Sequence, residues 1–139
     1  MIIGDNDPGL KRSLKDYYEA MIEQVKASER LGYECFWFGE HHFDFFGVIP
    51  SPPVIMSLAA KSTKKIRLGV AVSLLPFRNP ILTAEEYAMV DVLSKGRLVM
   101  GVGSGYLKHE FEGYQVDPAE KRERFDENLA LLTRLLSGE

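Results

Sequence analysis

Residues 66–75 read IRLGVAVSLL, and this stretch indicates the fold more clearly than any other part of the chain. Bulky apolar residues occupy every second position: Ile66, Leu68, Val70, Val72 and Leu74. The positions between them carry Arg67, Gly69, Ala71 and Ser73, and most of these are small. Alternation with a period of two predicts a β-strand with two different faces. We expect the bulky face to pack on helices. The small face then either leaves room for a flat ring or packs closely with no ligand.

Helical segments separate this strand from others of its kind. Four helices are expected, each opening after an N-cap residue: Ser13, Ser51, Asn79 and Asp117. The last helix is expected to bury a stripe formed by Phe125, Leu129, Leu132 and Leu136. Further strands are expected at residues 33–38 and 98–102, with a possible short strand at residues 1–3.

Strands that alternate with helices predict an α/β fold with parallel strands and right-handed crossovers. About four βα units are expected in this chain. Two architectures fit that order, an open doubly wound sheet and part of a (β/α)8 TIM barrel. In both, functional residues gather at the carboxyl ends of the strands.

The bulk composition excludes several classes of protein. The chain has 139 residues, which predicts a single domain over residues 1–139. A formal net charge of -3, without a basic cluster, gives no support for a nucleic-acid partner. We expect no membrane association, because no apolar run is long enough to span a bilayer. The N-terminal residues lack a secretory pattern, and the single Cys35 excludes an internal disulfide, so we expect a cytoplasmic protein.

The first candidate site is Glu40–His41–His42, which follows the predicted strand at residues 33–38. A neutral imidazole exchanges protons near pH 7, and an adjacent carboxylate tunes that exchange. Two surface histidines in a loop are the alternative interpretation. We expect no metal site, because only His109 remains elsewhere and Cys35 is the only cysteine.

The second candidate is GVGSGY, residues 101–106, where glycines alternate at the end of the strand. A dinucleotide-binding fingerprint needs a third glycine that opens directly into a helix. Here Tyr106 takes that place, and the residues that follow have weak helical character. The run therefore indicates backbone laid bare for an aromatic ring, or simple tight packing.

These sites together resemble the bacterial luciferase-like flavin monooxygenases. The resemblance is carried by YECFWFGEHHF (33–43), by the strand ending in LLP with the SKGR that precedes the glycine-rich strand (63–106), and by HEFEGYQVDPAEKRERFDENLALL (109–132). It implies a (β/α)8 barrel that binds reduced FMN, or a deazaflavin coenzyme in sister groups. Such an enzyme uses oxygen to oxidise a small organic substrate.

The resemblance also assigns residues. His41 matches the family's catalytic histidine, His42 its supporting neighbour, and Glu40 a buried carboxylate behind them. Ala71 and Val72 match a pair joined by a non-prolyl cis peptide bond beneath the flavin ring.

The glycine-rich run supplies the remaining cofactor-binding candidates. Gly103 matches a position beside the flavin, and Tyr106 ends the same run. Ser104 stands where luciferase has an arginine that helps to hold the phosphate, so phosphate binding here would depend on a hydroxyl group.

A complete barrel of this kind takes about 250 residues or more. We therefore expect this chain to be a truncated half-barrel, with the family's main phosphate-binding groups on later strands. Family members commonly dimerise through helices of the first half, which implies a homodimer. The alternative function is a non-catalytic half-barrel module that acts only as a dimer or with a partner chain.

Overall fold

The computed structural model describes residues 9, 11–45 and 47–138. The helices are α1 (Leu14–Arg30), α2 (Pro52–Ser62), α3 (Pro80–Ser94), α4 (Lys108–Tyr114) and α5 (Lys121–Ser137). The strands are β1 (Cys35–Phe38), β2 (Arg67–Leu74) and β3 (Leu98–Gly103). Short 3-10 turns lie at η2 (Leu75–Phe77) and η3 (Pro118–Glu120). The predicted strand at residues 1–3 lies outside the described residues.

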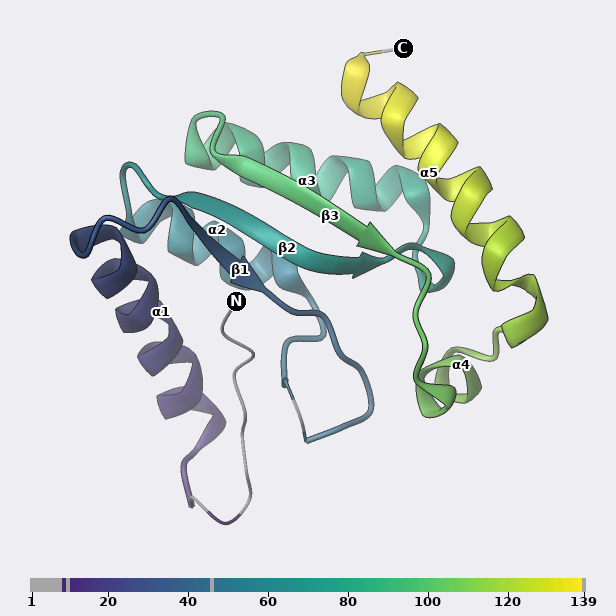
Figure 1. Ribbon diagram of the computed structural model, residues 1–139, viewed down its shortest axis with the longest axis horizontal. Coiled ribbons are helices and arrows are strands. Elements are labelled where there is room, and N and C mark those ends of the chain that lie inside the picture. Colours follow the sequence, from purple (N-terminus) through teal and green to yellow (C-terminus); the bar gives the residue numbers. More distant parts are fainter. Residues whose placement is uncertain (1–8, 10, 46, 139) are drawn as a thin grey trace.

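The three described strands form one parallel sheet in the order β1-β2-β3. A doubly wound sheet reverses its strand order at a switch point, and the described strands show no such reversal. This order is consistent with part of a (β/α)8 barrel, the predicted fold class. In Figure 1, α2 and α3 lie behind the sheet, and the loops that follow the strands gather near α4.

Most of the helices begin where the sequence predicts. The side chains of Ser13, Asn79 and Asp117 accept hydrogen bonds from backbone N–H groups at the starts of α1, α3 and η3. Such bonds satisfy donors that have no partner within the helix. Ser51 makes no capping bond with its side chain, and α2 opens with Pro52 and Pro53 instead.

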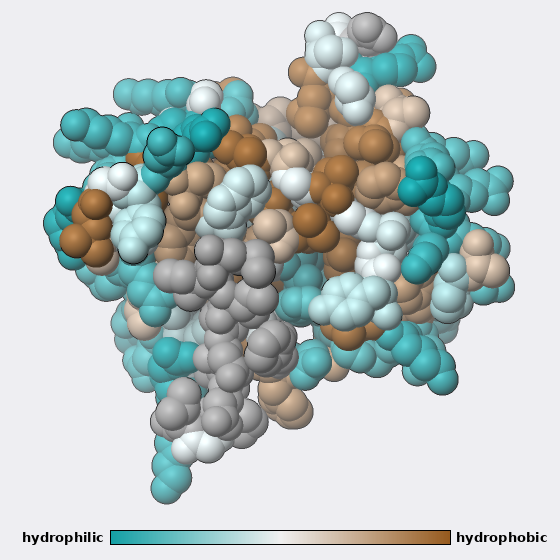
Figure 2. All heavy atoms as spheres, viewed as in Figure 1, coloured by the Kyte–Doolittle hydropathy of each residue, from teal (hydrophilic) through white to brown (hydrophobic). Residues whose placement is uncertain are grey.

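The main core lies between the sheet and the helices. Leu68 and Val70 of β2 are fully buried, together with Tyr87 and Val90 of α3. The opposite face of the sheet has no described helix against it. Figure 2, which has the same view as Figure 1, shows apolar residues gathered over that face. In a closed barrel this face would line the interior.

The SKGR run serves the fold. The Arg97 guanidinium donates to the carbonyl oxygens of Ala60 (2.9 Å) and Ile66 (2.8 Å) and to the hydroxyl of Thr63 (2.9 Å). These bonds tie the start of β3 to the end of α2 and the start of β2, because a guanidinium presents several donors in a fixed plane. The role of this arginine is therefore structural.

The predicted alternation along β2 is correct only as far as Val70. The pairing with β3 is irregular between Val70 and Ser73, and the Ala71–Val72 peptide bond is cis, as the family resemblance implied. A one-residue irregularity moves the following side chains to the other face. Ser73 is accordingly fully buried near the phenol of Tyr87, whereas Val72 lines a cavity on the open face. The prediction that Val72 and Leu74 share a face with Leu68 and Val70 is wrong.

Gly69 also differs from the expectation of open space for a ligand. Its pairing partner on β1 is Trp37, and a Cβ at residue 69 would lie 2.3 Å from Cε3 of that indole. The flat ring that Gly69 accommodates is therefore one of the chain's own.

The expected stripe on α5 is correct except at its end. Leu132 is buried and Phe125 and Leu129 are partly buried, but Leu136 is 43% exposed and Leu135 packs inward instead. Figure 1 shows the last turns of α5 extending past the other elements, where little remains for Leu136 to pack against.

The buried phenol of Tyr87 predicts how stability depends on pH. Burial raises the pKa of Tyr87 above the ordinary value of 10.0, and the Ser73 hydroxyl offsets this only in part. The folded protein thus holds this proton more tightly than the unfolded chain, so stability is intact below about pH 10 and falls as the pH rises further.

We expect Tyr87→Phe to flatten this alkaline loss of stability, measured as urea midpoints from about pH 9 to about pH 11. Tyr33→Phe, at a tyrosine that is 64% exposed, is the matched control and should follow the wild type. A decline in Tyr87→Phe as steep as in the wild type would contradict the assignment.

Candidate functional site

A cavity of about 370 Å³ opens at the carboxyl ends of the strands. Its lining comes from the loop after β1, the end of β2, and the end of β3 with the segment that follows it into α4: Glu40, His41, Ala71, Val72, Leu74, Gly103, Ser104, Gly105, Tyr106 and Glu110. The structure thus brings together Glu40, His41, Ala71, Val72, Gly103, Ser104 and Tyr106, which are the predicted site residues other than His42. Parallel strands that end at one edge explain this convergence.

His41 lies at the wall of the cavity. Its Nδ1 atom is buried and lies 3.4 Å from Oε1 of Glu110, whereas 17% of the side chain remains exposed. The backbone N–H of His41 points to the carbonyl oxygen of Ile49 at 3.4 Å. One side of the ring therefore lies against Glu110, and a small part of the side chain remains exposed.

Glu40 is buried and is contacted by two polar groups. Its Oε1 lies 3.0 Å from Nε2 of His42 and 3.3 Å from Nη1 of Arg78. Burial alone would lower the pKa of Arg78, but the charge of Glu40 raises it above its usual value, with help from Glu86. Oε2 of Glu40 is buried and has no hydrogen-bond partner among the described residues. This atom is a vacant acceptor in a residue that lines the cavity.

His42 faces away from the cavity and joins the loops to one another. Its Nε2 contacts Glu40, and its Nδ1 lies 2.9 Å from the hydroxyl of Tyr114. Its backbone N–H donates to Oε1 of Glu110 at 3.0 Å. Burial raises the pKa of Tyr114, and the charge of Glu40 acts in the same direction. With both ring nitrogens engaged, His42 is placed to support the site from behind.

Aromatic rings hold the same loops together. Phe77 stacks on Tyr114 with ring centroids 5.0 Å apart, and Phe43 meets Tyr114 edge to face at 5.3 Å. The neighbouring Gly113 leaves room for this ring, since a Cβ there would lie 2.3 Å from Cε2 of Phe43 and would displace it. Such ring pairs contribute roughly 0.5–1.5 kcal/mol each beyond the area they bury.

The sequence did not reveal three of these residues. Arg78 follows the end of β2, where a charged residue beside an apolar strand was an available signal. Glu110 and Tyr114 lie on α4, a segment with only weak helical character in the sequence. Glu110 is separated from His42 by 68 positions, so no local pattern connects them.

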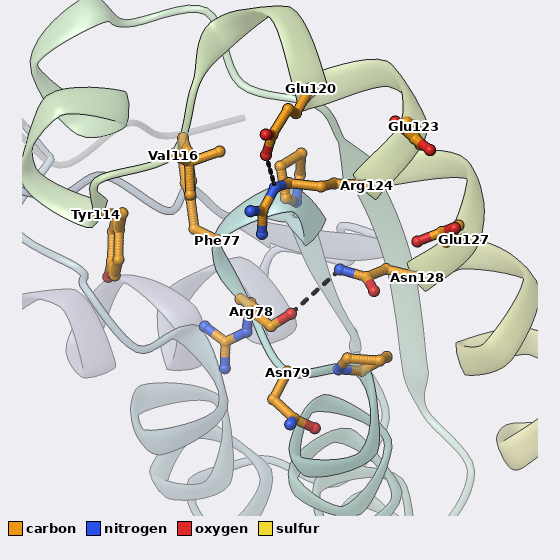
Figure 3. Close-up of a pocket in the computed structure, with 12 residues that line it drawn as sticks. Phe77, Arg78, Asn79, Tyr114, Val116, Glu120, Glu123, Arg124, Glu127 and Asn128 are labelled. Atoms are coloured by element: carbon orange, nitrogen blue, oxygen red, sulfur yellow. Dashed lines mark hydrogen bonds and ion pairs between the residues drawn. The ribbon is translucent and has the colours of Figure 1, made fainter.

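A larger cleft, of about 660 Å³, lies between the connection from β2 to α3 and helix α5 (Figure 3). Asn128 closes one side by donating to the carbonyl oxygens of Leu75 and Arg78. Three carboxylates line the cleft: Glu120, Glu123 and Glu127. Both arginines that line the cleft are already paired, Arg124 with Glu120 and Arg78 with Glu40 and Glu86. An anionic cofactor would be repelled here, so the smaller cavity is the better candidate.

Metal and membrane sites are not visible in the described part of the chain. Among these residues no group of three or more His, Cys, Asp or Glu side chains is arranged to hold a metal ion. The described helices also include none that is both long and apolar enough to cross a bilayer.

The lining of the His41 cavity fits the ring of a flavin but not its phosphate. Glu40 Oε2 can accept a hydrogen bond from a ring N–H, and Ala71 with Val72 forms an apolar wall. Gly103 lies close against Val72, where a Cβ would be 2.4 Å from Cγ2. No lysine or arginine lines this cavity in the described residues, and Ser104 supplies only a hydroxyl.

Comparisons with known proteins agree with this geometry. The model of the family described as luciferase-like monooxygenase matches residues 2–139. Limonene 1,2-monooxygenase of Rhodococcus erythropolis is 37% identical over 118 residues, which are 85% of this chain and 30% of that protein. The oxygenase component of flavin-dependent trigonelline monooxygenase from Acinetobacter baylyi is 37% identical over 102 residues, which are 73% of this chain and 28% of that protein.

Solved structures show the same architecture. Monooxygenase RslO1 from Streptomyces bottropensis superimposes with a TM-score of 0.90 at 28% identity, covering 95% of this chain and 40% of that one. The oxygenating constituent of 3,6-diketocamphane monooxygenase from Pseudomonas putida, solved with FMN, gives 0.84 at 21% identity over 89% and 36% of the two chains. The F420-dependent tetrahydromethanopterin reductase of Methanopyrus kandleri gives 0.66 at 25% identity over 84% and 36%.

This chain therefore spans about a third of the length of the relatives it matches. The match of the family model extends over nearly all of the chain, and identities above 30% cover most of it. The chain belongs to the luciferase-like monooxygenase family.

Proposed function

We propose that this protein serves flavin-dependent monooxygenation, with the flavin ring in the His41 cavity, and that FMN is the cofactor. The observation that carries the proposal is the meeting of His41, Glu40 and the Ala71–Val72 wall in one cavity, with one buried oxygen of Glu40 left without a hydrogen-bond partner among the described residues. The flavin-dependent relatives support the same chemistry. The substrate is proposed to be a small organic molecule.

Reduced flavin supplies the activation of oxygen when it is bound, and the protein supplies position, shape and proton control. His41 can accept or donate a proton at the edge of its ring that faces the cavity. Glu40 would accept a hydrogen bond from a bound ring, and Val72, Gly103 and Tyr106, which line the same cavity, would bound it. Ser104 can donate one hydrogen bond to a phosphate, while His42 holds Glu40 in place.

The lack of basic side chains in the described lining indicates that the ring and the phosphate of the cofactor bind in different parts of a complete barrel. Because no basic side chain lines the cavity, we propose that this region holds mainly the ring, and that other parts of a complete barrel bind the phosphate. A deazaflavin coenzyme is the alternative cofactor, since its ring needs the same space. The protein is proposed to act in the cytoplasm, in keeping with an unpaired Cys35.

Flavin titration tests this proposal directly. We expect protein fluorescence or flavin absorbance to change on adding FMN, with a dissociation constant between about micromolar and millimolar. Riboflavin should bind nearly as well as FMN, because the cavity offers the phosphate no cation. Ala71→Phe should fill the cavity and weaken binding at least about tenfold, a loss of about 1.4 kcal/mol.

Ala130→Phe, on the exposed face of α5, is the matched control and should bind like the wild type. No change at about millimolar flavin with folded protein would contradict the proposal, as would equal binding by Ala71→Phe. A titration with the deazaflavin coenzyme distinguishes the two cofactors. Absence of binding by either would favour the non-catalytic half-barrel module.

We also propose a homodimer formed through the outer faces of α2 and α3. Large apolar side chains are exposed there: Val54 (71%), Leu58 (52%), Leu82 (58%), Met89 (64%) and Val92 (77%). An apolar groove of about 360 Å³ between Tyr18, Ile49 and Leu58 extends this surface. Exposed apolar patches of this kind are typical of protein interfaces.

Sedimentation of Val92→Glu tests the dimer. The wild type should sediment as a dimer, and Val92→Glu should shift toward monomer, because a buried unpaired carboxylate opposes association. Leu31→Glu, at a residue 76% exposed at the end of α1, is the matched control and should remain dimeric. A stable wild-type monomer would contradict the proposal.

A further inference from the structure

We propose that Glu110 is a positioning residue for His41. Its buried carboxylate holds the imidazole with the proton on Nδ1 and turns the opposite edge, which carries Nε2, toward the cavity. This inference rests on the proposed function of His41. The residues concerned, however, all lie within this chain, and their arrangement needs no bound cofactor.

The first argument is burial. Glu110 lies in the first turn of α4, its side chain is only 1% exposed, and an acid so deep in a protein requires polar partners. Two lie within reach of Oε1. The backbone N–H of His42 donates at 3.0 Å, and Nδ1 of His41 lies at 3.4 Å, within ion-pair distance but outside hydrogen-bond geometry. Glu110 therefore contacts both members of the histidine pair.

The second argument is the orientation of the ring. Nδ1 of His41 is buried, although 17% of the side chain is exposed, so the exposed part is another edge of the ring. An ionised carboxylate can accept hydrogen bonds but cannot donate them, and a neutral imidazole carries one N–H. Glu110 thus favours the proton on Nδ1, which leaves a lone pair on Nε2.

The third argument is the contrast with His42. Both of its ring nitrogens are engaged, by Glu40 and Tyr114, and the side chain is only 6% exposed. It has no free edge to offer a ligand. The two adjacent histidines therefore have different roles: His42 joins the loops, and His41 presents Nε2 to the cavity. A carboxylate partner fixes the orientation of each ring.

Nitrogen-15 NMR of the imidazole rings tests this assignment in the unliganded protein. The chain has three histidines, so their signals can be assigned by single substitutions. We expect His41 to be the Nδ1–H tautomer when neutral. If neutral His41 carries its proton on Nε2, the proposal is overturned. The measurement needs no flavin, so it stands apart from any failure of the binding experiment.

A matched pair of variants on α4 then isolates the role of Glu110. Glu110→Gln keeps the size of the side chain but removes its charge, and we expect His41 to change from the Nδ1–H form to a mixture of tautomers. Glu112→Gln alters an exposed carboxylate whose partner is Lys108, and it should leave the His41 spectrum unchanged. An unaltered His41 spectrum in folded Glu110→Gln would overturn the proposal. Should that variant fail to fold, the wild-type tautomer decides the question.

Discussion

The buried charge of Glu40 is the constraint on which the rest of this site depends. An ionised carboxylate removed from water is costly unless opposite charges and hydrogen bonds offset the lost solvation. Arg78 and His42 supply that compensation, and they come from different parts of the chain. Compensating the lost solvation of Glu40 therefore brings the loop after β1 against the segment that follows β2.

The same contacts extend to the segment after β3. His42 bridges Glu40 and Tyr114 through its two ring nitrogens, and the Tyr114 ring stacks on Phe77. Glu110 adds a second buried carboxylate that binds the backbone of His42 and lies beside His41. The outcome is a rigid frame of polar and aromatic contacts behind the cavity wall. Such a frame can hold a ring and a proton-exchanging group at fixed positions, which is the part that the proposed flavin chemistry requires of the protein.

Much of this architecture could be predicted from the sequence, because it depends on local patterns. The alternation in 66–70, the caps at Ser13 and Asn79 and the order of the elements gave the βα units, and the spacing of glycines and histidines pointed to the strand ends. Local patterns failed where a distant partner decides the outcome. The irregularity after Val70 reversed the faces of β2, and Trp37 filled the space at Gly69. Glu110 was missed because its partners are far away in the sequence.

A double-mutant cycle in urea unfolding, pairing Glu40→Gln with Tyr114→Phe, tests the central claim most directly. Each of these two side chains contacts one ring nitrogen of His42, which therefore links them. If the frame acts as one unit, the two losses in free energy of unfolding should be non-additive, with a coupling of about 0.5–3 kcal/mol. Additive losses, agreeing within about 0.3–0.5 kcal/mol, would show that Glu40 does not organise the loops through His42.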